Sequence, residues 1–122
     1  MEFEIDDYEG SNGRDYAEEF LSDLAGSNEE LWAKIVAQIK KLKLKQYHKE
    51  PFSEAFGNGL FCVRAKSKTD IARVFFCFGK GKKIYLLRGF VKKDQKTPNE
   101  EIKKAIKLLK EFEKRPHYAK TA

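Results

Sequence analysis

Three short segments in the middle of the chain, residues 60–66, 71–78 and 83–91, are rich in β-branched and aromatic residues. Only four or five turn residues separate each segment from the next. This pattern predicts three consecutive antiparallel strands, a β-meander. Alternation places Ile71, Arg73, Phe75 and Cys77 on one face of the middle strand. Since both faces are largely apolar, we expect one face to pack on helices and the other to be at least partly covered.

The chain before the meander predicts two helices and a short strand. Residues 3–8 alternate weakly, which suits an edge strand. A first apolar stripe has helical spacing and stops at Gly26, and a second begins at a capping-box pattern of Ser27 and Glu30. The stripes are Ala17, Phe20, Leu21 and Leu24, then Leu31, Ile35, Ile39 and Leu42. Because about two residues join them, we expect an antiparallel helix hairpin.

Two further segments complete the predicted fold. Residues 50–59 contain Pro51, Gly57 and Gly59 and are expected to form a loop. After the meander, Thr97, Pro98 and Glu100 predict an N-cap, a proline at the first helical position and a capping-box glutamate. An apolar stripe from Ile102 to Phe112 then predicts a helix that covers the sheet.

The expected fold class is α+β, in one domain that spans residues 1–122. Its antiparallel sheet combines the N-terminal strand with the meander, and helices cover it. The predicted division is a strand and turn at 1–13, the helix hairpin at 14–46, the meander at 60–91, the C-terminal helix at 98–115 and a tail at 116–122.

Charge is distributed unevenly along the chain. The formal net charge is +6, but residues 1–30 hold eleven of the nineteen acidic residues and one basic residue, a net charge of −10. The remaining residues therefore carry +16. Such a division presents a strongly positive surface to a polyanion, and nucleic acid is the first candidate.

Other classes of site and location find little support. Cys62 and Cys77 lie in apolar segments, and with His48 and His117 they lack the spacing of metal ligands, so we expect core thiols, no metal and no cofactor. An acidic N-terminus and the lack of a long apolar run predict a cytoplasmic protein without a membrane partner.

Arginines and lysines form the candidate site. Arg64, Arg73 and Arg88 lie within the three meander strands and could project toward a shared anion, or each could pair with a local carboxylate such as Glu54 or Asp70. Further cations and rings are candidates for RNA contacts, and Tyr47 and Phe90 could stack on bases. The candidates outside the strands are Lys45, His48, Lys49, Lys92, Lys93, Lys96 and Tyr118.

The segments VRAK, IARVFF and LLRGFVKKDQKTP, in this order of elements, resemble the RelE/ParE superfamily of type II toxin–antitoxin toxins. Within it they are most similar to the HigB-like, phage-derived group. The most specific part is residues 90–98, followed by Glu101, Ile102 and Ala105.

The resemblance implies a RelE-like microbial RNase fold and an mRNA interferase, an endoribonuclease that cleaves mRNA on the ribosome and inhibits translation. It implies catalytic roles for Arg64, Arg73, Lys92 and Lys93. Arg88 stands where many relatives have histidine, which argues against acid–base chemistry by histidine at this position. Tyr118 is a loose match to a tyrosine of the RelE branch. The implied partners are mRNA, the ribosome and a HigA-like helix-turn-helix antitoxin, which could also bring the complex to operator DNA.

Metal-free cleavage by the 2′-hydroxyl needs a proton acceptor, donors for the phosphorane oxygens and a proton donor for the leaving oxygen. Arginine suits the phosphate because its planar fork meets two oxygens, and a lysine crowded by cations can act as the base. Lys92 or Lys93 fits this role, and His48 is a second candidate. Two alternatives stay open: a ParE-like gyrase-inhibiting toxin and a non-catalytic nucleic-acid-binding module.

Overall fold

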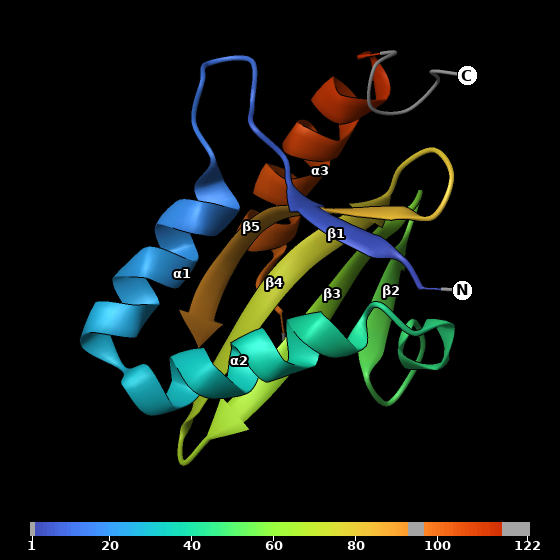
Figure 1. The fold of residues 1–122 in the computed structure, drawn as a ribbon. Helices are drawn as coiled ribbons and strands as arrows, with labels where there is room; N and C mark the ends of the chain where they lie inside the picture. Colours follow the sequence, from blue (N-terminus) through green and yellow to red (C-terminus); the bar gives the residue numbers. More distant parts are fainter. Residues whose placement is uncertain (1, 93–96, 116–122) are drawn as a thin grey trace.

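The computed structural model describes residues 2–92 and 97–115, and Figure 1 shows their arrangement. Lys93, Lys96, His117 and Tyr118 lie outside the described residues. The elements are β1 (Glu4–Asp7), α1 (Tyr16–Ser27), α2 (Glu29–Lys41), the short 3-10 helix η1 (Lys45–Tyr47), β2 (Ser53–Gly57), β3 (Leu60–Ser67), β4 (Asp70–Phe78), β5 (Lys83–Lys92) and α3 (Asn99–Glu113).

The described strands form one five-stranded mixed sheet in the order β1-β5-β4-β3-β2. The predicted meander is confirmed, since β3 pairs antiparallel with β4 and β4 with β5. The expectation of a wholly antiparallel sheet is wrong, because β1 pairs with β5 in parallel, with Glu4 opposite Lys83 and Asp7 opposite Leu86. Alternation within β1 could not reveal its direction, because both kinds of pairing share the two-residue period.

The predicted loop at 50–59 contains a fifth strand. Ser53–Gly57 forms β2, which pairs antiparallel with the start of β3. The connection is the two-residue turn Asn58–Gly59, and both residues have positive φ, 58° and 87°. Asn-Gly is the preferred sequence of such a hairpin turn, because these two residues tolerate positive φ at low cost. The glycines at 57 and 59 therefore mark a hairpin rather than the absence of structure.

Helices cover both faces of the sheet (Figure 1). On one face, α1 and α2 pack over a cluster that includes Leu31, Ile35, Val74 and Phe76. On the other, α3 packs with Leu109 and Phe112 against Phe75 and its neighbours. The middle strand is buried on both faces for this reason, as its apolar composition requires.

The first two helices do not form the expected antiparallel hairpin. Figure 1 shows α1 following β5, while α2 turns away and crosses β3 and β4. Only Asn28 separates the two helices, and its backbone is extended, with φ −155° and ψ 82°. This single residue changes the direction of the chain. An antiparallel helix hairpin, by contrast, needs a loop of about two to five residues.

Both predicted helix starts are displaced by one residue. Asn28, not Ser27, caps α2, and its side chain accepts a hydrogen bond from the Leu31 amide at 3.2 Å. For α3 the N-cap is Pro98, with no side-chain cap, and the Thr97 hydroxyl is buried. Gly26 does not stop α1, which continues through Ser27.

Candidate functional site

Cations from three neighbouring strands share one face of the sheet. Arg64 of β3 lies directly opposite Arg73 of β4. On the other side of β4, Phe90 is opposite Arg73 and Lys92 is opposite Ile71. Because side chains alternate along a strand, Lys92 and Arg88 point to the same face as Phe90. The register therefore brings Arg64, Arg73 and Lys92 together at the end of the sheet that carries the β3–β4 turn.

Arg73 is the most buried of these cations, with 1% of its surface exposed. Burial lowers the pKa of its guanidinium, and the charge of Arg64 lowers it further, whereas Glu54 acts in the opposite direction. An arginine nevertheless stays protonated in proteins. Arg73 thus places a fixed positive charge beneath the surface, almost wholly shielded from solvent.

Arg64 is the accessible member of the pair. Its side chain is 30% exposed, and its guanidinium meets two carboxylates, Glu50 at 3.1 Å and Glu54 at 3.7 Å. The same group donates a hydrogen bond to the carbonyl of Pro51 at 3.2 Å. Local carboxylates therefore hold Arg64, as one of the two sequence interpretations anticipated, but both carboxylates face solvent and the pairs are open to competition by a phosphate.

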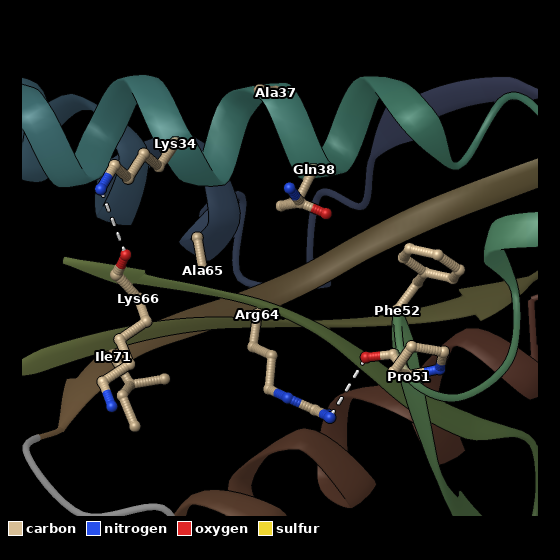
Figure 2. Close-up of a pocket in the computed structure, with 9 residues that line it drawn as sticks. All are labelled: Lys34, Ala37, Gln38, Pro51, Phe52, Arg64, Ala65, Lys66 and Ile71. Atoms are coloured by element: carbon tan, nitrogen blue, oxygen red, sulfur yellow. Dashed lines mark hydrogen bonds between the residues drawn. The ribbon is translucent and has the colours of Figure 1, made fainter.

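A cavity of about 510 Å³ adjoins Arg64 (Figure 2). It lies along β3 next to the start of β2, with α2 above it. Its lining residues are Lys34, Ala37, Gln38, Pro51, Phe52, Arg64, Ala65, Lys66 and Ile71. Figure 2 shows Lys34 and Gln38 reaching down from α2, and Lys34 approaches the carbonyl of Lys66 at 3.5 Å. Three cations, an amide and an exposed Phe52 ring can accommodate an anion with a flat base attached.

Sequence reasoning did not find Lys34, Gln38 and Phe52 as members of this site. Lys34 and Gln38 lie on the polar side of α2, and their closeness to β3 depends on the way α2 crosses the sheet. Phe52 is 36% exposed and packs its ring edge-to-face on Tyr47 at 4.7 Å. The only signal for Phe52 that the sequence offered was its position directly after Pro51.

Lys45, His48 and Lys49 lie elsewhere. His48 packs on Phe3 and Phe78, and its Nε2 donates a hydrogen bond to the Leu42 carbonyl at 2.6 Å. Phe78 is the last residue of β4, and Ile71, opposite Lys92, is its second. The seven steps between them span about 23 Å along the strand. The structure therefore does not bring His48 close to Lys92.

Arg88 occupies a third position, near the start of α3. Its guanidinium lies 3.5 Å from Glu101 and 5.8 Å from the centre of the Tyr16 ring. It lines a cavity of about 440 Å³ that is separate from the one beside Arg64. Among the other rings proposed for stacking, Phe90 is buried against Phe75 and Tyr47 packs on Phe52.

In the part of the chain that the structure describes, no cluster of three or more His, Cys, Asp or Glu could hold a metal ion. Cys62 and Cys77 are buried in the apolar layer under α3, and burial raises the pKa of each thiol to about 12. Both thiols are therefore protonated and pack as small apolar groups. No helix in the described ranges is long and apolar enough to cross a membrane.

Comparison with known proteins adds one finding. A model of the family described as phage-derived Gp49-like proteins (DUF891) matches residues 22–110, which include α2, the whole meander and most of α3. A search of curated proteins found no significant match.

Proposed function

Because the chain belongs to the phage-derived Gp49-like family, a family of RelE/ParE-like toxins, we propose that it is the toxin of a type II toxin–antitoxin pair and cleaves mRNA on the ribosome. The α+β architecture, with a mixed sheet between α1 and α2 on one face and α3 on the other, is consistent with a RelE-like fold. The HigB-like assignment within that superfamily is part of this proposal, as is action in the cytoplasm, where ribosomes are found.

The cross-strand pair of Arg64 and Arg73 is the observation that carries the proposal. Two guanidiniums on adjacent strands, Arg64 at the surface and Arg73 beneath it, concentrate positive charge where a phosphorane would develop negative charge. Arg64 would exchange Glu50 and Glu54 for the scissile phosphate, and Arg73 would support this charge from beneath. The adjoining cavity offers Phe52 and Gln38 for a neighbouring base.

Lys92 is the proposed general base among the described residues. It ends β5 on the same face as Arg73 and is partly exposed. As the general base, its amine would accept the 2′-hydroxyl proton. The roles of Lys93, Lys96 and Tyr118 stay proposals that concern residues outside the described ranges.

The proposed silencing partner is a HigA-like helix-turn-helix antitoxin, which would also carry the complex to operator DNA. We place its contact on the acidic outer side of α1, where Glu18 and Asp23 are exposed. A second mode, an acidic antitoxin segment over Arg64 and Lys34, is equally compatible with the charges.

One observation favours the non-catalytic alternative. Arg73 is almost fully buried and Arg64 is held by carboxylates, so the described side chains form a binding surface more readily than a preorganised catalytic site. A nucleic-acid-binding module would bind RNA with a steep salt dependence and leave it intact.

The test compares Arg64→Gln with Arg14→Gln in a translating extract, with mRNA fragments read by primer extension. Arg14 is the matched control, an exposed arginine paired with Glu19 on α1. Loss of one phosphate contact in the transition state should lower the cleavage rate about 100-fold for Arg64→Gln, while Arg14→Gln should cleave like the parent protein. Intact mRNA with the parent protein on translating ribosomes would refute the nuclease, and DNA damage on induction would indicate the gyrase alternative.

A further inference from the structure

A second cationic cluster lies at the end of the sheet that carries the β4–β5 turn. There the N-terminal segment, the residues around η1 and the ends of β3 and β4 surround a cavity of about 620 Å³. Its lining residues are Phe3, Lys45, Gln46, His48, Lys49, Phe61 and Phe78. We call it the aromatic pocket. Its volume is within the range of about 300–1,000 Å³ that small-molecule sites occupy.

Backbone hydrogen bonds fix the walls of the aromatic pocket. The amide of Phe3 donates to the carbonyl of Lys43 at 2.8 Å, which ties the N-terminal segment to the end of α2. The next amide, that of Glu4, donates to the carbonyl of Lys82 in the β4–β5 turn at 2.8 Å. These bonds join three distant parts of the chain at this end of the sheet (Figure 1).

The walls are aromatic rings set edge to face. Phe3 meets His48 at 4.6 Å between ring centres and an angle of 82°, and Phe61 meets Phe78 at 5.2 Å and 80°. All four residues are partly exposed. In an edge-to-face pair only one ring uses its face, so other ring faces remain available to a flat guest. The hydrogen bond from His48 to Leu42 holds the imidazole in place.

Lysines surround these rings. Lys45 and Lys49 line the aromatic pocket, and the Lys82 ammonium lies 4.9 Å from the centre of the Phe3 ring. Among the described residues, none of these three lysines makes an ion pair with a carboxylate, whereas neighbouring Lys83 is paired with Asp6 at 2.9 Å. Their charge is therefore available to an external anion.

We propose that the aromatic pocket binds one unpaired base of single-stranded RNA, with its flanking phosphates on Lys45, Lys49 and Lys82. A base is flat and can stack on the ring faces. The phosphates on either side of the base can bind the lysines that surround these rings. An acidic peptide would satisfy the lysines but would leave the ring faces without a stacking partner. The choice of RNA over DNA rests on the proposed function, while Arg64 is not among the lining residues of the aromatic pocket.

The experiment uses the full chain and three probes of equal charge: an RNA tetranucleotide, the same chain with its central bases removed, and an acidic tetrapeptide that contains phenylalanine. Binding is followed by fluorescence anisotropy and by amide chemical shifts at Gln46 and Phe61, with Gln38 and Lys66 reporting on the cavity beside Arg64. Base removal should weaken binding about fivefold to a hundredfold, the equivalent of ~1–3 kcal/mol.

Two sets of variants separate the contributions. Lys45→Ala with Lys49→Ala should weaken tetranucleotide binding at least about tenfold, and Phe61→Leu, which keeps an apolar side chain, should abolish the preference for the intact base. The matched control is Lys103→Ala with Lys114→Ala, which removes two exposed charges from the α3 side and should bind like the parent.

The outcomes are distinguishable from those for cleavage. Tight binding by Arg64→Gln, with shifts at Gln46 and Phe61, supports the aromatic pocket whether or not the protein cleaves mRNA. Equal affinity for the base-free chain, shifts confined to Gln38 and Lys66, or tighter binding of the peptide would each overturn the proposal.

Discussion

At Gly89, α1 packs closely against the sheet through Phe20. This glycine lies in β5, and a methyl group at this position would sit 2.7 Å from a ring carbon of Phe20 and 2.9 Å from the carbonyl oxygen of Arg73. Backbone atoms of β4 cannot move without breaking the ladder that aligns Arg73 with Arg64. The packing of α1 and the alignment of Arg64 with Arg73 therefore both depend on a glycine at position 89.

Gly89→Ala should lower the free energy of unfolding by about 2 kcal/mol, because overpacking forces the backbone and the Phe20 ring apart. Urea denaturation measures this loss. Gly26→Ala is the matched control: it lies in α1 with nothing within 4 Å of the added methyl, and it should raise stability by about 0.5–1 kcal/mol. Equal effects of the two substitutions would contradict the close contact.

Single-residue reasoning went furthest for the arginines. Alternation within a strand was enough to place Arg64 and Arg73 on one face, since the meander leaves few choices of register. It could not provide Glu50 as a partner, because that glutamate precedes a strand that was interpreted as a loop. Nor could it show how deeply Arg73 lies, since its burial depends on α3 and the layer of rings beneath it.

At the scale of elements, the three meander strands were predicted to within one residue, whereas the predicted helix hairpin ran to residue 46 and α2 ends at Lys41; the connections were not predicted. The strands β3, β4 and β5 have eight, nine and ten residues, most of them apolar, whereas β2 has only five residues and a register shift between Ala55 and Gly57. A short, irregular edge strand has no period to detect, so only its Asn58–Gly59 turn could have revealed it. The course of α2 across the sheet depends on one residue, Asn28.

Asn28→Ala should lower the free energy of unfolding by about 1 kcal/mol, because the side-chain oxygen that accepts the Leu31 amide is lost. Thermal unfolding followed by circular dichroism measures the change. Ser27→Ala tests the cap expected from the sequence pattern, and since Ser27 is an exposed last residue of α1, it should leave stability within about 0.5 kcal/mol. The reverse ranking would restore Ser27 as the cap.

Across the whole molecule, acidic side chains of the N-terminal part of the chain come close together where Asp7 of β1 lies near Asp15 and Glu18 at the start of α1. Burial raises the pKa of Asp7 from 3.8 to about 6, and the charge of Asp15 and a hydrogen bond with its side chain add to the effect. Asp15 is also the N-cap of α1, accepting the Glu18 amide at 2.9 Å. The folded protein therefore holds a proton on Asp7 that the unfolded chain releases at lower pH.

The sign of the pH dependence follows from this difference. A pKa raised by folding gives stability that is complete below about pH 3.8 and is lost as the pH rises through about 6. Asp7→Asn should thus raise the free energy of unfolding at pH 7.5 by about 1 kcal/mol, allowing for solvent screening, and change little below pH 4. Urea titrations across this range test it, with the exposed Asp23→Asn as control; a difference that is flat with pH for Asp7→Asn would contradict the shift.

The parallel pairing of β1 with β5 determines when the sheet can be completed during synthesis. The strand β1 can pair with β5 only after about eighty further residues have been synthesised, and Tyr8 and Ser11 then bond to Glu111 of α3. Closing so long a loop is slow relative to local hairpins. We therefore expect a nascent chain to carry a finished meander before it carries a finished five-stranded sheet.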